Sequence, residues 1–210
     1  MMTVLLVCAD LHGSDEALDL LRKAESDLSP DAVIVCGDVT TYGSVEYMNR
    51  LLDNFDSDLM AVPGNCDTDE MLRMLEQAGA SVHNRCVRKL GLDIFGFGGG
   101  LTSAAHMPFE VEEEDMVAGL KGVAVRGGVM VIHTPPRGMN DIDRSGRHLG
   151  SKGVLGVVEE FRPRLVLSGH IHESRGECTQ DGTVFVNPGP ARGGRYALVK
   201  LGQKVEVKLF

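Results

Sequence analysis

Several short apolar segments of the sequence end in side chains that can bind a metal ion. The ligand-type residues that follow these segments are Asp10 with His12, Asp38, Asn65, His133, and His170 with His172. In an α/β fold, the carboxyl ends of parallel strands lie at one edge of the sheet, and ligands bind there. We therefore expect carboxylate, amide and imidazole groups from all of these segments to converge on one site.

The number and chemistry of these side chains indicate a site for two metal ions. Seven ligands exceed what one transition-metal ion binds, but they suit two ions that share a bridging carboxylate. Paired ions lie about 3.5–4 Å apart and bind the attacking and leaving oxygens of a phosphoryl transfer. Mixed nitrogen and oxygen ligands favour divalent Mn, Fe, Zn, Ni or Co over a closed structural zinc site. Any one of these residues alone could equally be a turn residue or a helix cap.

The two histidines at the end of the last apolar segment show the geometry that we expect. A short apolar run, residues 165–167, ends at a Ser-Gly step, as a buried strand does at its edge. In an extended chain, residues two positions apart point to the same side. The spacing predicts that His170 and His172 face the same place, just past the end of the strand.

The elements that must position these residues alternate between strands and helices in the first part of the chain. The strands are expected at residues 3–8, 32–36 and 59–62, and the helices at 14–26, 44–55 and 68–78. This alternation predicts a sheet with right-handed crossovers and with helices on its faces.

The second part of the chain is less regular and richer in strands. We expect a hairpin at 85–97, helices at 110–120 and 153–161, and strands at 129–132, 165–167, 183–186, 195–201 and 204–209. Residues 134–151 form a loop, and loops longer than about 12–15 residues are usually functional or disordered. No repeat or linker divides the sequence, so we expect residues 1–210 to form a single domain.

The composition argues against several classes of protein. The chain has 210 residues with 43% hydrophobic content, which is ordinary for a globular core. No apolar run approaches the roughly 18 residues of a membrane span, and the first run meets Asp10 too early for a signal peptide. We therefore expect a cytoplasmic protein without a membrane partner. The net charge of −9 argues against a large nucleic-acid surface, and five cysteines without a CxxC spacing fit reduced thiols.

Taken in order, these motifs resemble those of the calcineurin-like metallophosphoesterases. The matching blocks span residues 10–172 and are Asp10-x-His12, Gly37-Asp38, Gly64-Asn65-x-Asp67, His133 and Gly169-His170-Ile171-His172. The blocks His133-Thr-Pro-Pro and Asn187-Pro-Gly are similar to those of the small single-domain prokaryotic phosphodiesterases of that superfamily. The resemblance implies an α/β fold with mixed sheets, arranged as a four-layer α/β/β/α sandwich whose second sheet the strand-rich tail would complete.

The resemblance also implies a role for each ligand. The first metal ion would bind Asp10, His12 and His172, the second would bind Asn65, His133 and His170, and Asp38 would bridge the two ions. The expected nucleophile is a hydroxide bound between the ions, because metal ions lower the pKa of bound water. The implied activity is hydrolysis of a small phosphoester substrate, most simply a diester.

One position departs from the family pattern. Many members carry Gly-Asn-His-Asp/Glu, in which the histidine is thought to protonate the leaving oxygen, whereas this chain has Cys66 there. A thiol with a reference pKa of about 8.5 could donate a proton, but a buried inert thiol is the simpler interpretation. Asp67 is a catalytic candidate, although a partner of a ligand histidine or a helix cap is the simpler interpretation. His148 is the other candidate donor, or else an exposed loop histidine.

The long loop completes the expected site. We expect it to lie over the metal ions, so that Arg137, Arg144 or Arg147 meets the substrate phosphate. Two alternatives to a phosphodiesterase stay open: a phosphomonoesterase, and a catalytically weak or inactive protein-binding scaffold on the same fold. The presence of all seven family ligands favours an enzyme. A homo-oligomer is compatible with the sequence.

Overall fold

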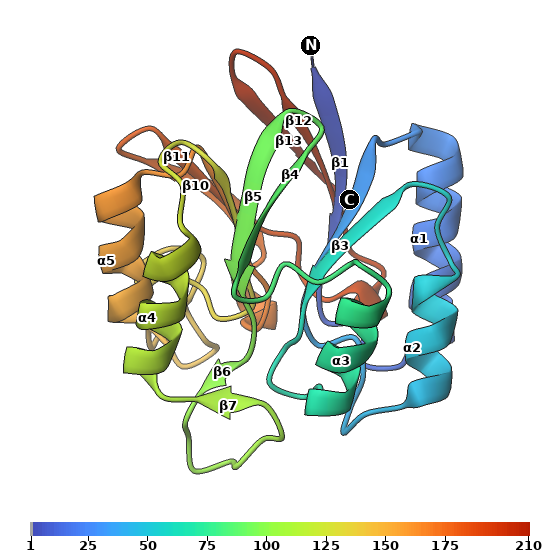
Figure 1. Cartoon of the computed structure of the whole chain (residues 1–210), viewed down its shortest axis with the longest axis horizontal. Helices are drawn as coiled ribbons and strands as arrows, with labels where there is room; N and C mark the ends of the chain where they lie inside the picture. The colour runs from blue at the N-terminus through green and yellow to red at the C-terminus, as the bar shows by residue number, and fades with distance from the viewer. Residues whose placement is uncertain (1) are drawn as a thin grey trace.

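The computed structural model describes residues 2–210 as two β-sheets packed face to face, with helices on both outer sides (Figure 1). The layers follow the order helix, sheet, sheet, helix, and each sheet contains both parallel and antiparallel pairs. The predicted four-layer α/β/β/α sandwich with mixed sheets is confirmed.

The first sheet is built around the amino-terminal strand. Its strands, in spatial order, are β13 (Val205–Leu209), β12 (Ala197–Leu201), β1 (Thr3–Cys8), β2 (Ala32–Cys36) and β3 (Asp58–Val62). The pairs β1–β2 and β2–β3 are parallel, whereas β12 is antiparallel to both β1 and β13.

The second sheet contains the segment that ends in the paired histidines. Its strands, in spatial order, are β10 (Gly176–Gln180), β11 (Thr183–Asn187), β9 (Leu165–Leu167), β8 (Val129–Ile132), β5 (Leu92–Phe97) and β4 (Arg85–Lys89). The strands from β11 to β5 are parallel, and the edge strands β10 and β4 are antiparallel to their neighbours. The tail therefore divides between the sheets, because β11 joins the second sheet while β12 and β13 join the first. This corrects the expectation that the tail completes the second sheet.

Helices cover the outer face of each sheet. The first sheet is covered by α1 (Asp15–Leu28), α2 (Val45–Leu52) and α3 (Asp69–Gln77), and the second by α4 (Glu113–Val123) and α5 (Lys152–Phe161). Serine side chains begin three of these helices, because Ser14, Ser44 and Ser151 each accept a backbone hydrogen bond from the residue three positions later.

Two local features differ from the sequence-based expectation. The helix predicted at 110–120 begins only at Glu113, because Glu110–Val111 forms a short strand, β7, that pairs with β6 (Gly100–Leu101). The edge strand β10 was not predicted, because its sequence, Gly-Glu-Cys-Thr-Gln, is largely polar and partly exposed.

The strands are apolar along their length because both of their faces are buried. In β1, Leu5 and Val7 face the second sheet and pack in one cluster with Val131 and Leu167, whereas Leu6 and Cys8 face the helices of the first sheet. Side chains of successive residues point to opposite faces of a strand, so this alternation fixes the register of β1 between two cores.

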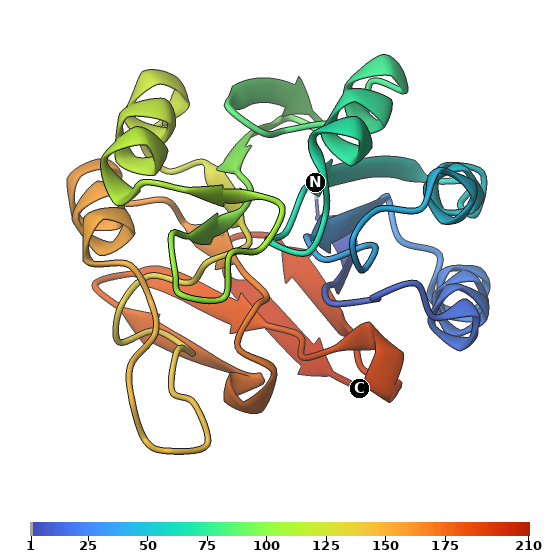
Figure 2. The same cartoon turned by 90° about the horizontal axis from the view of Figure 1, so that it is seen from below.

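The parallel strands of both sheets end at the same edge of the sandwich, which faces the viewer in Figure 2. The loops at this edge carry the residues that were predicted to bind metal. Every helix within residues 2–210 is too short or too polar to span a lipid bilayer.

Candidate metal centre

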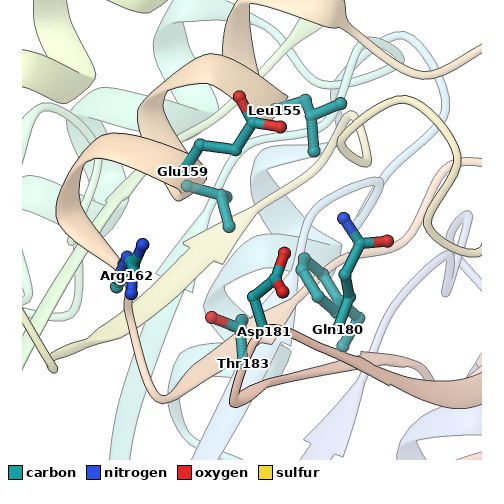
Figure 3. A pocket seen from close by; sticks show the side chains of 8 residues that line it. Leu155, Glu159, Arg162, Gln180, Asp181 and Thr183 are labelled. Carbon is teal, nitrogen blue, oxygen red and sulfur yellow. The ribbon is translucent and has the colours of Figure 1, made fainter.

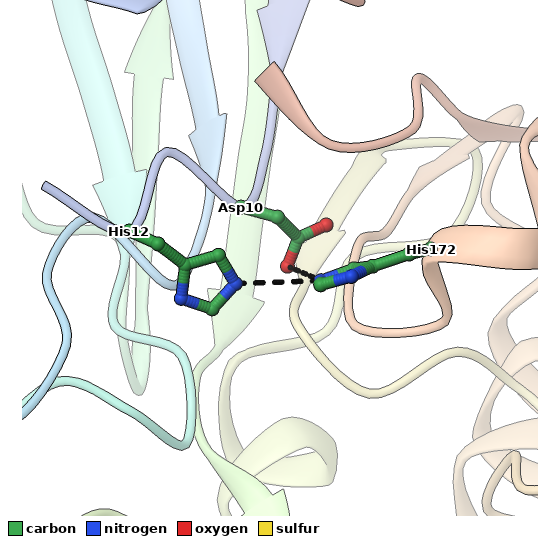
Figure 4. A group of neighbouring side chains, drawn as sticks. All are labelled: Asp10, His12 and His172. Atoms are coloured by element: carbon green, nitrogen blue, oxygen red, sulfur yellow. Dashed lines mark hydrogen bonds and ion pairs between the residues drawn. The ribbon is translucent and has the colours of Figure 1, made fainter. Parts of the chain in front are cut away.

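The structure brings three of the predicted ligands together directly after β1 and β9. Asp10, His12 and His172 place their ligand atoms within 4.8 Å of one another (Figure 4). The Nε2 atoms of the two histidines lie 3.4 Å apart, and the Asp10 Oδ1 lies 3.5 Å from the His172 Nε2. We call these three residues the first cluster.

The other predicted ligands lie beside the first cluster, after β3, β8 and β9. The His133 Nε2 is 2.9 Å from the Asn65 Oδ1, and the rings of His133 and His170 have centroids 4.9 Å apart. We call Asn65, His133 and His170 the second cluster. Asp38 lies between the clusters, with one carboxylate oxygen 3.6 Å from the His12 Nε2 and the other 3.5 Å from the His133 Nε2.

Several of these atoms face one another as hydrogen-bond acceptors. The His133 Nδ1 lies 2.8 Å from the backbone oxygen of Cys36, so Nδ1 donates and the Nε2 of the neutral ring is an acceptor. That Nε2 faces the Asn65 Oδ1, which also accepts. The Asp10 Oδ2 is buried and has no hydrogen-bond partner among residues 2–210. Converging acceptors without donors fit a bound cation, and buried unpaired polar atoms are otherwise costly.

The backbone at these positions is unusual. Asp10, His12, Asp38 and His170 all have positive φ angles, between 50° and 68°, although none of them is a glycine. Such conformations cost energy and collect at functional sites. His170 is therefore not in extended backbone, and His172 begins a 3₁₀ turn, η1 (His172–Ser174). The extended geometry from which the spacing argument started is therefore absent. Both histidines lie at the ligand edge, but His172 contacts the first cluster and His170 contacts the second.

Close backbone approach explains the glycines that precede two of the ligands. A Cβ atom on Gly64 would lie within 2.1 Å of the Asp38 carboxylate, and one on Gly37 would lie 2.5 Å from the His133 Nδ1. Both distances are far below van der Waals contact, so only glycine allows the loops after β2 and β3 to meet here.

The histidines of the two clusters have shifted pKa values. Burial, together with the neighbouring His133, lowers the pKa of His170 to about 4. The hydrogen bond with Asp10 raises the pKa of His172, whereas burial is the main cause that lowers the pKa of His12. His170 is therefore neutral near pH 7, as a metal ligand must be.

Asp67 joins two of the loops that carry ligands. The buried Asp67 carboxylate accepts backbone hydrogen bonds from Val39, Thr40 and Gly64, and a further one from the Thr40 hydroxyl. Burial raises the pKa of Asp67 to about 6. Its oxygens are thus engaged in joining the loops after β2 and β3.

Cys66 lies at the boundary of the first cluster. Its Sγ lies within 4.8 Å of ligand atoms of His12 and Asp38, and its backbone N–H donates to the Asp38 Oδ1 at 2.8 Å. Burial, followed by the charge of Asp38, raises the pKa of the thiol well above its usual value. A thiol with a raised pKa is a poor proton donor, so this position offers little general-acid chemistry.

The long loop after β8 pairs its predicted substrate residues with other groups. Arg147 bonds Asp143 at 2.9 Å and Arg144 bonds Glu173 at 2.8 Å, while Arg137 donates to the backbone oxygen of His148 at 3.1 Å. Figure 2 shows this loop projecting to one side of the ligand edge. The arginines of the loop therefore make protein contacts in this structure.

His148 has a defined orientation within the loop. Its Nδ1 lies 2.7 Å from an oxygen of the buried Asp141, and its side chain is 40% exposed. Among residues 2–210, no hydrogen bond or ion pair joins His148 to either cluster. Its role as a proton donor stays a prediction.

Some residues at this edge were missed by the sequence reasoning. The Thr41 hydroxyl lies 3.3 Å from the His12 Nδ1 and can fix that ring. The buried Asn187 amide donates to the backbone oxygen of Ile171 at 2.9 Å and so supports the turn that carries both histidines. Arg192 acts on the pKa of His12 and of His172. The Asn187-Pro-Gly block was visible in the sequence, but its contacts were not.

A separate pocket lies away from these residues. It has a volume of about 270 Å³ and lies between α5 and the β10–β11 hairpin, lined by Glu159, Arg162, Asp181 and neighbouring residues (Figure 3). None of the predicted site residues lines it.

Three comparisons relate the chain to known proteins. The family model described as calcineurin-like phosphoesterase matches residues 3–174. An uncharacterized protein of Methanocaldococcus jannaschii is 31% identical over 191 residues, covering 86% of this chain and 85% of that protein. The structure of TT1561 of Thermus thermophilus has a TM-score of 0.77 at 20% identity and covers 99% of both chains. An archaeal phosphodiesterase has a TM-score of 0.58 at 15% identity, covering 99% of this chain and 100% of that one. At these identities, the two structures show a shared fold.

Proposed function

Because the chain belongs to the calcineurin-like phosphoesterase family, we propose that it is a phosphoesterase whose two clusters bind two divalent metal ions. The observation that carries this proposal is the convergence of acceptors without donors, above all the His133 Nε2 and the Asn65 Oδ1 at 2.9 Å. Bound there, divalent Mn, Fe, Zn, Ni or Co ions would lower the pKa of a shared water and offset the charge on phosphate oxygens.

Each cluster would bind one of the two ions. Asp10, His12 and His172 would hold one ion, and Asn65, His133 and His170 the other, with an oxygen of Asp38 directed toward each cluster. The backbone oxygen of Cys36 and the Thr41 hydroxyl would orient the rings of His133 and His12. The Asp67 contacts would keep the loops after β2 and β3 at a fixed separation.

We propose small phosphodiesters with good leaving groups as the substrates. The thiol of Cys66, with its raised pKa, occupies the place at which many family members have a histidine donor. General acid catalysis contributes typically about 10²–10⁴-fold, and its loss matters least for leaving groups that depart without a proton.

The test is a metal and substrate panel on the purified chain. Chelator-treated protein is reconstituted with Mn, Fe, Ni, Co, Zn or Mg and assayed on bis-(4-nitrophenyl) phosphate, on 2′,3′- and 3′,5′-cyclic nucleotides, and on phosphomonoesters. We expect two bound ions per chain and metal-dependent hydrolysis that is fastest on the activated diester. Faster turnover of monoesters would replace the diester assignment, and a chain that binds no transition metal and hydrolyses nothing would be a scaffold.

We further propose His148 as the proton donor for less activated diesters. Its contact with the buried Asp141 orients the ring and leaves Nε2 free to donate. His148→Ala should lower the rate on an unactivated diester by about 100-fold, the low end of general-acid effects, and change the rate on bis-(4-nitrophenyl) phosphate little. Steady-state rates of both substrates check this, with the exposed His106→Ala as the matched control. Equal losses on the two substrates, or none, would exclude the acid role.

A further inference from the structure

Arg192 lies in the short turn η2 (Ala191–Gly193), which is attached to the end of β1. The backbone N–H of Ala191 donates to the oxygen of Ala9 at 2.8 Å, and that of Arg192 donates to the oxygen of Asp10 at 3.3 Å. Asp10 belongs to the first cluster, so η2 holds Arg192 at the rim of the candidate metal centre. Figure 2 shows this turn on the same face as the loops that carry the ligands.

The backbone places Arg192 beside a residue of the first cluster. Its N–H donates to the backbone oxygen of Asp10, and the carboxylate of Asp10 belongs to that cluster. A cation carried by this turn is positioned to attract an anion that approaches the cluster.

The guanidinium of Arg192 is also free to bind a ligand. It is exposed, and among residues 2–210 its side chain has neither a carboxylate partner nor a hydrogen-bond acceptor. Arg144 and Arg147, by contrast, are already paired with Glu173 and Asp143. A paired arginine must give up its carboxylate before it can bind phosphate, whereas Arg192 need not.

The chain has a net charge of −9, so an unpaired arginine beside the metal ligands supplies positive charge where an anionic substrate would bind. We propose that Arg192 binds a non-bridging oxygen of the substrate phosphate at the first cluster, and that it sets the affinity of the site for phosphoesters. This inference rests on the proposed phosphoesterase function and deepens it. A guanidinium donates two parallel N–H groups to phosphate oxygens, which gives both charge and orientation.

The test compares phosphate binding by the metal-loaded wild-type chain, Arg192→Ala, Arg192→Lys and the control Arg195→Ala. Arg195 lies three residues further on and is also exposed. Calorimetric titration with inorganic phosphate should show affinity reduced by about 10- to 100-fold in Arg192→Ala, the effect of losing a hydrogen bond between charged groups. Arg192→Lys should fall between, because it keeps the charge but loses the paired geometry, and Arg195→Ala should match wild type.

Hydrolysis of bis-(4-nitrophenyl) phosphate supplies the second measurement. Arg192→Ala should lower kcat/KM by a similar factor while the content of bound metal, measured by mass spectrometry, stays unchanged. Equal phosphate affinity in wild type and Arg192→Ala would overturn the role of Arg192, and so would an equal loss in Arg195→Ala. Absence of metal-dependent hydrolysis in the wild type would instead overturn the proposed function, and the titration would still decide whether Arg192 binds phosphate.

Discussion

The two clusters contain similar groups but differ in charge. The first cluster has a carboxylate of its own, Asp10, whose hydrogen bond raises the pKa of His172. The second cluster has the neutral amide of Asn65 instead, and burial beside His133 lowers the pKa of His170 to about 4. Two histidines that are two residues apart in the sequence therefore have pKa values shifted in opposite directions. The difference indicates that protons compete with a cation more strongly at His172 than at His170.

Removing the residue shared by the clusters should have the largest effect. Asp38→Ala removes the carboxylate whose two oxygens lie 3.6 Å and 3.5 Å from a histidine of each cluster. We expect both ions to be lost and activity to fall by more than about 100-fold. Loss of a residue that only orients a metal ligand costs up to about 100-fold, and loss of a shared ligand should cost more. Metal analysis and rate measurements check this, with the exposed Asp19→Ala as control. Retention of two ions per chain in Asp38→Ala would rule out the bridging role.

Two single substitutions, one in each cluster, should each affect a different metal position. His172→Ala should empty the metal position of the first cluster, and His170→Ala that of the second, because each ring contacts a different set of ligands. Activity should fall by about 10- to 100-fold or more in both variants. Occupancy from anomalous scattering gives the answer site by site. Equal loss from one shared position would contradict the division into two clusters.

Lowering the pH should release the ion of the first cluster before that of the second. We expect this effect to be smaller than those of the Asp38 and histidine substitutions. Because the pKa of His172 is raised, a proton competes with metal in the first cluster at a higher pH. The pKa of about 4 keeps His170 neutral until the solution is far more acidic. We expect the wild-type chain to lose its first-cluster ion before its second as the pH falls from about 7 to 5. The metal occupancy of each position, measured by anomalous scattering at several pH values, checks this. Loss of the second-cluster ion first would contradict the proposed difference in charge between the clusters.

Much of the fold could be predicted because its strands are buried on both faces. The apolar runs at residues 3–8 and 32–36 are typical of strands and predicted them directly. The edge strand β10 could not be predicted, because a half-exposed strand of polar residues has no apolar pattern. The start of α4 was displaced for a related reason: the pairing of β7 with β6 is a tertiary contact that no local signal specifies.

The candidate site was predictable in its residue types but not in its geometry. All seven predicted ligands lie at one edge because the parallel strands end there. The positive φ of His170 could not be anticipated, because left-handed backbone outside glycine is imposed by the surrounding fold. Arg147 could have been judged differently, since Asp143 lies four residues before it and pairs with it. Arg192 has no spacing to mark it, because only the attachment of η2 to β1 brings it to the site.

The contacts of Asp67 have a consequence for how fast the chain takes up metal. Its carboxylate ties the backbone of Thr40 to that of Gly64, so it fixes two ligand-bearing loops without using any ligand atom. A site held by such bonds keeps its shape when empty, and preorganised sites spend little free energy on ordering when they bind. Metal uptake should then follow single-exponential kinetics with no slow rearrangement. Asp67→Asn, which cannot accept all of these bonds, should add a lag before the ions bind.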